Sequence, residues 1–223
     1  HQRLSPGCID ECVSLACRES AIVSPGVRGF GRFSWTTHGA KFSLCPRNGY
    51  FSGTWKLRKP RSRVTTSNTL RAPGYVMPRS IYEKVRWSEA MQGWGASEAA
   101  IAVKAFFQDI PILQLTGPVA RHLFRHSFPY ATRWEGVWRN HAVIARICFT
   151  DKTWHRHWLP KLFSKHLSSQ SLELLESKAI ALEHAEFQRR KTKEDQSFWT
   201  EMAQIQPPAA VPTAAGTSQS VAA

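Results

Sequence analysis

The hydrophobic periodicity of the chain changes near residue 130, and this change limits the possible folds more than any other feature. Before it, short apolar runs alternate with turn residues, which is typical of strands and short helices joined by turns. After it, apolar residues recur at helical spacing in three segments, 134–149, 153–166 and 168–202. The pattern therefore predicts a mixed α/β region followed by helices.

From this pattern we expect an α/β region over residues 1–150, a helical appendage over 151–204 and a disordered tail over 205–223. In the last helical segment, the predicted buried stripe consists of Leu172, Leu175, Ala179 and Leu182. No run of about 18 apolar residues is present, so no transmembrane helix is expected.

Turn and capping residues predict the elements of the first part. Ser5, followed by Pro, is expected to cap a helix that runs to about Glu19. Asn48-Gly49 between two alternating runs predicts a hairpin. Strands are expected over 68–77, with an interruption at Pro73-Gly74, and over 110–115, and a Thr-Gly-Pro turn follows the second of them.

The charge of the chain is strongly positive, with 30 Lys and Arg against 16 Asp and Glu, a formal net charge of +14. No acidic residue occurs between Glu19 and Glu83, and a basic loop, Lys56 to Arg63, follows Trp55. This surplus fits a nucleic acid, an anionic membrane surface or a phosphorylated ligand, and equally a solvated basic surface. The five cysteines are odd in number and lack metal-ligand spacing, which favours reduced thiols and a cytoplasmic location.

Three short motifs carry possible chemistry. In Gly93-Trp94-Gly95-Ala96-Ser97-Glu98, a turn is followed by a helix that Ser97 is expected to cap, which could aim the Glu98 carboxylate and an apolar platform into one cleft. His122 at a strand end could bind a metal and Arg125 a phosphate, or His122 could be structural. Trp154, His155, His157 and Trp158 are interpreted as a packed helix face rather than as ligands.

Taken in order, these motifs resemble the second half of a GT-A-fold glycosyltransferase of the family 2 type, similar to the polypeptide N-acetylgalactosaminyltransferases. His1 to Gly7 looks like the end of a DxD or DxH metal motif, and Ala72 to Arg79 resembles the segment at the sugar end of the donor site. Trp94 to Glu98 is similar to a WGG-acidic motif, and His122 to Arg125 resembles GHxFR. The resemblance covers about residues 1–155, with Ala96, Ser97 and Arg121 departing from the family pattern.

The resemblance implies a partial GT-A fold with a mixed sheet, followed by the helical appendage. It also implies a metal-dependent transferase of hexosyl or N-acetylhexosaminyl groups, with Glu98 as the catalytic residue. Mn²⁺ or Mg²⁺ would be held by His1, His122 and an Asp expected two residues upstream of His1, where a nucleotide-binding half is also expected. The substrate-binding residues implied are Trp94, Gly95, Gly74, Tyr75, Arg125 and Tyr130.

The expected partners are a nucleotide-diphospho-sugar donor and an unidentified glycan, protein or lipid-linked acceptor. In this interpretation nucleic acid is not expected, and contact with an anionic membrane surface remains open. The alternative is a non-enzymatic basic module that binds nucleic acid or another polyanion. Neither the donor sugar nor the stereochemical outcome follows from the sequence.

Overall fold

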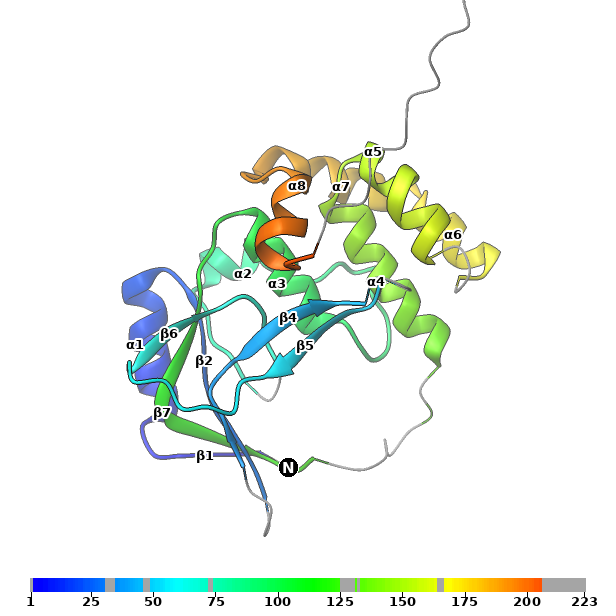
Figure 1. Cartoon of the computed structure of the whole chain (residues 1–223). Helices are drawn as coiled ribbons and strands as arrows, with labels where there is room; N and C mark the ends of the chain where they lie inside the picture. Colours follow the sequence, from blue (N-terminus) through cyan, green and yellow to red (C-terminus); the bar gives the residue numbers. More distant parts are fainter. Residues whose placement is uncertain are drawn as a thin grey trace, which may run out of the picture.

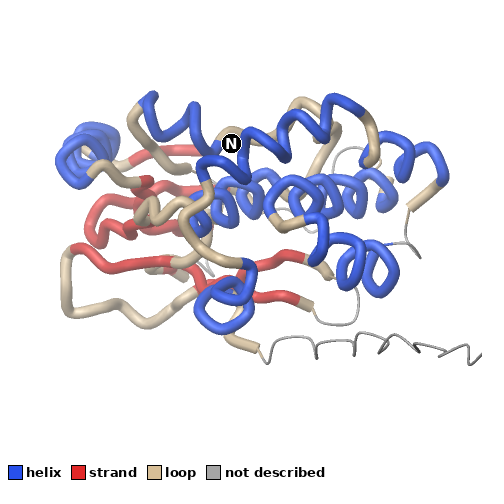
Figure 2. Tube along the Cα trace, turned by 90° about the horizontal axis from the view of Figure 1, so that it is seen from above, coloured by secondary structure: helices blue, strands red, loops and turns tan. Residues whose placement is uncertain are grey.

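The computed structural model describes residues 2–30, 35–45, 49–71, 74–124, 131, 133–163 and 167–205. The strands are β1 (Gln2–Leu4), β2 (Ile22–Gly29), β3 (Thr36–Thr37), β4 (Ala40–Leu44), β5 (Phe51–Trp55), β6 (Val64–Ser67) and β7 (Ile112–His122). The helices are α1 (Cys8–Glu19), α2 (Arg79–Val85), α3 (Ser97–Phe107), α4 (Trp134–Cys148), α5 (Asp151–Thr153), α6 (Ser169–Leu175), α7 (Lys178–Arg190) and α8 (Asp195–Ser197). Two π-helical segments, η1 (Trp154–Phe163) and η2 (Phe198–Met202), continue α5 and α8. Most helices gather on one side of the molecule and the strands on the other (Figures 1 and 2).

The main sheet is mixed, and β7 is its central strand. β2 runs parallel to β7 on one side, whereas β6 and β1 pair antiparallel with the beginning and the end of β7 on the other. The expected turn after residue 115 does not end this strand, because residues 116–118 form an irregularity opposite Pro25 and Gly26. Its backbone is satisfied from the neighbouring loop: the N–H of Thr116 donates to the carbonyl of Arg63 at 2.8 Å.

The two faces of the sheet are covered by different helices. Val23 of β2 and Leu113 of β7 pack with the buried side of α1, in a cluster that includes Cys8 and Cys12. Ile22, one residue earlier, belongs to the larger cluster with α3 and α4. This alternation follows from the two-residue period of a strand, and it places the larger core on the face away from α1.

Two local predictions in this part are wrong. Helix α1 begins at Cys8 with Gly7 as its cap at φ 69°, whereas the hydroxyl of Ser5 accepts a hydrogen bond from the N–H of Val119 at 3.0 Å. Ser5 therefore links the chain to β7 and does not cap the helix. The strand expected over 68–77 lies earlier, at β6, and among the described residues of that stretch Val76 alone makes a bridge, to Val23.

The hairpin is present as β4 and β5, which form a separate two-stranded sheet; residues 46–48 of its turn lie outside the described residues. The larger core joins Phe42 and Phe51 of this hairpin to Trp154, Trp158 and Phe198, so it extends beyond residue 150. Both tryptophans are fully buried, which confirms the predicted packing for them, whereas His155 is exposed. The domain boundary at residue 150 stays a prediction.

The single helix expected over 168–202 is divided in the structure. Ser177 caps α7 by accepting a hydrogen bond from the N–H of Ile180, and this new start shifts the phase of the buried face. Ile180, His184 and Phe187 are buried, whereas Leu182 is 63% exposed. Of the predicted stripe, only Leu175 is fully buried. Within the described residues, no helix combines the length and the apolar character that crossing a membrane requires.

Candidate functional site

The turn before α3 has an unusual backbone that is held by one buried side chain. Gly93, Gly95 and Ala96 have positive φ angles of 72°, 105° and 71°. The side-chain amide of Asn140 in α4 donates to the carbonyls of Gln92 and Gly95 at 3.0 and 3.1 Å, and it accepts from the N–H of Gln92 at 3.1 Å. The turn is therefore fixed to the first half of α4.

Gly95, a predicted substrate-binding residue, has a packing requirement of its own. A Cβ atom at this position would lie 3.3 Å from Cγ1 of Val137 in α4, at a φ angle that favours glycine. The turn can therefore approach α4 only because residue 95 has no side chain.

Glu98 lies in the first turn of α3, where the helix dipole favours a negative charge. The capping prediction was wrong: Ala96 occupies the N-cap position and makes no side-chain hydrogen bond. Ser97 is instead the first residue of the helix, and its hydroxyl donates to Oε2 of Glu98 at 3.0 Å. This contact orients the carboxylate that the sequence singles out as catalytic.

Glu98 shares its electrostatic environment with Tyr75 and Arg71. Burial, followed by the charges of Glu98 and Tyr82, raises the pKa of Tyr75 to about 12. Burial lowers the pKa of Arg71, and Glu98 and Tyr50 oppose that change. A carboxylate, a guanidinium and a protonated phenol therefore act on one another in this part of the molecule.

The predicted segment Gly74–Tyr75 is placed by its neighbour Val76. The backbone of Val76 exchanges two hydrogen bonds with Val23 of β2, both at 2.8 Å. Tyr75 packs against the larger core. Apart from the chain neighbours of Gly74, no atom of the described residues lies within 4 Å of the point where a Cβ of Gly74 would be, so none of them blocks the approach of another group there.

Sequence reasoning missed Tyr50, whose charge acts on Arg71, and His141, which contacts Tyr50. Their ring centroids are 4.2 Å apart, and Nδ1 of His141 accepts a hydrogen bond from the N–H of Phe51 at 3.2 Å. Burial lowers the pKa of His141 to about 3, and its Nε2 has no hydrogen-bond partner among the described residues. The imidazole is therefore neutral at physiological pH.

His122 ends β7 and faces an exposed aromatic group. The β1–β7 register pairs it with Gln2, the residue after His1, and its ring lies edge-on to Phe124 at 4.6 Å. Phe124 stacks on Trp35 at 5.4 Å, and Trp35 lies 6.3 Å from Trp55. We call Trp35, Trp55 and Phe124 the aromatic platform.

The aromatic platform also contacts Arg71, whose guanidinium carbon lies 4.7 Å above the ring of Trp55. The guanidinium also donates to the carbonyl of Gly53 in β5. The platform thus links His122 to the surroundings of Glu98. Among the predicted site residues, His1, Arg125 and Tyr130 lie outside the described residues.

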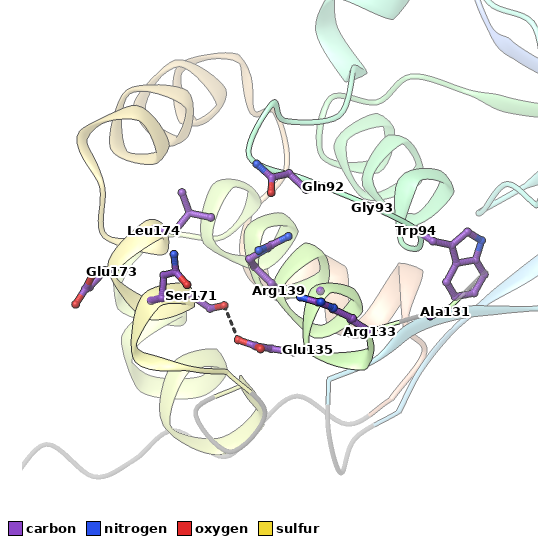
Figure 3. A pocket seen from close by; sticks show the side chains of 12 residues that line it. Gln92, Gly93, Trp94, Ala131, Arg133, Glu135, Arg139, Ser171, Glu173 and Leu174 are labelled. Atoms are coloured by element: carbon purple, nitrogen blue, oxygen red, sulfur yellow. Dashed lines mark hydrogen bonds between the residues drawn. The ribbon is translucent and has the colours of Figure 1, made fainter. Parts of the chain in front are cut away.

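A pocket of about 1100 Å³ is lined by residues of the turn before α3, of α4 and of α6 (Figure 3). Trp94, Arg133, Glu135 and Arg139 are among the residues that line it. Of the predicted site residues that the structure describes, Trp94 alone belongs to its lining. We call Glu98, Arg71 and Tyr75 the Glu98 group. The pocket is therefore adjacent to the Glu98 group rather than formed by it.

No family model and no curated protein matches the chain. A solved structure does: a crystal structure of GalNAc-T7 with UDP, GalNAc and Mn²⁺ superposes with a TM-score of 0.62 at 12% identity. The match covers 91% of this chain and 39% of that one, so the chain spans about two fifths of the length of the transferase. The fold is glycosyltransferase-like. This confirms the expected fold at the coarse level of a mixed α/β glycosyltransferase architecture.

The glycosyltransferase-like chain does not supply a complete metal centre from its described residues. They contain no group of three or more His, Cys, Asp or Glu side chains that could hold a metal ion. His122 is the predicted ligand that the structure describes, and the similar transferase was crystallised with Mn²⁺. The assignment of Mn²⁺ or Mg²⁺ to His1 and His122 stays a prediction.

Proposed function

We propose that this chain forms the acceptor side of a glycosyltransferase, which transfers a sugar from a nucleotide-diphospho-sugar to a hydroxyl group. The observation that carries the proposal is the position of Glu98 in a glycosyltransferase-like fold. The carboxylate follows a turn fixed by Asn140 and shares its electrostatic environment with Arg71 and Tyr75. Fixed charges around a reacting hydroxyl are the main means by which such a site can lower a barrier.

In the reaction, the acceptor oxygen forms a bond to the anomeric carbon of the donor sugar while the bond from that carbon to the diphosphate oxygen breaks. The electron pair leaves with the nucleoside diphosphate. In an inverting reaction Glu98 takes the proton of the acceptor hydroxyl, and in a retaining reaction it orients that hydroxyl. The hydrogen bond from Ser97 restricts the carboxylate to one direction in both cases.

The other predicted residues have separate roles in this proposal. Gly74 and Tyr75 would lie against the donor sugar, since none of the described residues blocks the space beside Gly74. Trp94 and Gly95 would face the acceptor. Arg125 would contact the diphosphate and Tyr130 would contact the substrate, as the family resemblance implies.

Replacement of Glu98 by Gln tests the proposal in the protein that contains this chain. Loss of a positioned general base lowers turnover by roughly 100- to 10,000-fold, so E98Q should reduce transfer by that range while nucleotide binding stays unchanged. Glu89 is a matched control, because its side chain is 96% exposed and it lies outside the Glu98 group. If E98Q and E89Q both transfer sugar at the rate of the unmodified protein, Glu98 has no catalytic role.

The basic loop supports a second candidate, a module that binds polyanions. Lys56, Arg58, Lys59 and Arg61 are exposed and form no ion pair among the described residues, whereas Arg63 pairs with Glu11. Replacing the four unpaired residues by Gln should abolish salt-dependent binding of a polyanion if this is the main activity. Metal-dependent binding of a nucleotide-sugar that survives the replacement would favour the transferase instead.

A further inference from the structure

The pocket beside Trp94 has the composition of a site for a polar ligand. Gln92 and Trp94 come from the turn before α3, Arg133 and Arg139 from the beginning of α4, and Gln170 from α6. Figure 3 shows the two arginines between Trp94 at one end and Leu174 at the other. Its volume of about 1100 Å³ exceeds what one sugar ring requires and fits a short oligosaccharide.

The two arginines in this pocket form no ion pair with a carboxylate among the described residues, although the charge of Arg139 acts on Glu135. The side chains of Arg133 and Arg139 take part in no hydrogen bond or ion pair among the described residues, and Nε of Arg139 is buried without an acceptor. An anion in the pocket would supply the strongest acceptor for the remaining guanidinium N–H groups of the two arginines. The pocket is therefore prepared for a negatively charged group.

The two carboxylates of the pocket do not lie between Trp94 and the arginines: that of Glu135 is hydrogen-bonded to serines, and that of Glu173 is far from Trp94 (Figure 3). Oε1 of Glu135 accepts from the N–H of Ser168 at 3.2 Å and from the hydroxyl of Ser171 at 3.1 Å. These hydrogen bonds, with a smaller effect of Arg139, lower the pKa of Glu135. Glu173 is exposed and lies at the end of the pocket away from Trp94 (Figure 3). Neither carboxylate therefore takes the place of an anion between Trp94 and the arginines.

Trp94 identifies the rest of the ligand. Its side chain is 40% exposed at the pocket, where the flat indole face can pack against the C–H groups of a sugar ring. The side-chain amides of Gln92 and Gln170 both donate and accept, which suits sugar hydroxyls. An aromatic face, amides and a pair of guanidinium groups together match a sugar that carries a carboxylate.

We propose that this pocket binds an acidic saccharide of the uronate class. Its carboxylate lies between Arg133 and Arg139, and its ring packs on Trp94. The turn that carries Trp94 leads into Glu98, so the saccharide bound there would be the acceptor of the reaction. This second assignment rests on the proposed function. Binding of the saccharide itself does not depend on transfer.

The test measures binding of tetragalacturonate, and of the same tetrasaccharide as its methyl ester, by calorimetry with the full chain at physiological salt. A charge-assisted hydrogen bond contributes about 1.5–3 kcal/mol, which corresponds to roughly 10- to 100-fold in affinity. The acid should bind at least about 10-fold more tightly than the ester. R133Q and R139Q should each remove most of this preference, and R139K, which keeps the charge but loses the fork, should recover part of it.

R189Q is the matched control. Arg189 is exposed on α7, and its replacement by Gln removes the same charge from the chain. If R189Q weakens binding as much as R139Q, the affinity reflects the overall charge of the chain and the proposal is wrong. Equal binding of the acid and the ester also overturns it. If the acid binds through the arginines but E98Q leaves transfer unchanged, the pocket assignment stands and the proposed role of Glu98 fails.

Discussion

Large aromatic side chains occupy two regions of this molecule under opposite conditions. In the helical region, Trp154 and Trp158 are fully buried between α4 and the segments that follow it. Around the candidate site, Trp35 and Trp94 are 42% and 40% exposed. A buried Trp contributes free energy of folding through its packing, whereas the exposed part of a partly buried one leaves a surface on which a ligand can pack.

The long cationic side chains of the two regions differ in their ion pairs, although Nε of Arg146 in the helical region is also buried without a hydrogen-bond partner among the described residues. In the helical region the ammonium of Lys191 is paired with Asp195 and also donates to the carbonyl of Cys148, and Lys104 is paired with Glu183. At the site, Arg133 and Arg139 have no such partners among the described residues. Strained backbone and unsatisfied polar groups collect at functional sites, because the rest of the fold stabilises them.

The largest expected effect comes from truncating one Trp in each region. Trp158→Ala should lower the free energy of unfolding by about 3–5 kcal/mol, because it removes a fully buried ring from the core. Trp94→Ala should lower it by about 1–2 kcal/mol, because the residue is 40% exposed and buries less surface than Trp158. Urea denaturation of both variants measures the difference.

Trp94→Ala should instead weaken binding of the acidic saccharide, and Trp158→Ala should not do so at temperatures where it remains folded. Equal losses of stability in the two variants would show that Trp94 belongs to the core and would remove the contrast between the regions.

The sequence pattern predicted those parts of the structure that local signals determine. Helix α4 occupies 134–148 within the expected 134–149, and the Trp94–Glu98 turn leads into a helix as expected. Arg71, Tyr50 and His141 were missed, because their relation depends on contacts between distant parts of the chain. The hydrogen bond from Phe51 to His141, for example, spans 90 residues. Periodicity carries no information about such pairs.

The prediction of which residues are buried after residue 168 was wrong for a different reason. It assumed one continuous apolar stripe across a position where Ser177 starts a new helix, although a Ser followed by a helical segment is itself a capping signal. Leu182 consequently became exposed and Ile180 buried. A short polar cap thus outweighs a longer hydrophobic pattern when the two disagree.

A medium effect is expected from His141, which lies where the two regions meet. Its folded pKa of about 3 is below the usual value near 6.5, so the unfolded chain binds a proton that the folded chain does not. Stability contributed by the neutral ring is complete above about pH 6.5 and is lost as the pH falls toward the folded pKa. Between pH 7 and pH 5 this loss amounts to about 2 kcal/mol.

The measurement is the free energy of unfolding at pH 7 and pH 5 for the unmodified chain and for His141→Asn. The Asn side chain keeps an acceptor near the N–H of Phe51 but does not titrate. Its stability should fall by about 2 kcal/mol less over this range than that of the unmodified chain. Parallel pH dependence in the two proteins would show that His141 titrates normally and is not desolvated.

The smallest effect tests whether the strained turn belongs to the site or only to the fold. Ala96 and Ser20 both have positive φ angles, 71° before α3 and 48° after α1. Replacing either by Gly relieves a conformation that costs a non-glycine residue about 1 kcal/mol, partly offset by the greater freedom of the unfolded chain. Each variant should therefore gain less than about 1 kcal/mol in thermal or urea denaturation.

The two variants should differ in binding, because the Ala96 turn is joined to Trp94 and the Ser20 turn is not. Ala96→Gly lets the peptide planes between Gly95 and Ser97 rotate, which loosens the segment that Asn140 fixes through the carbonyl of Gly95. We expect a reduction of about 2- to 5-fold in affinity for the acidic saccharide with Ala96→Gly and none with Ser20→Gly. If both variants are more stable and bind equally well, the left-handed residue before α3 is a feature of the fold alone, and the contrast between the two regions rests on side chains.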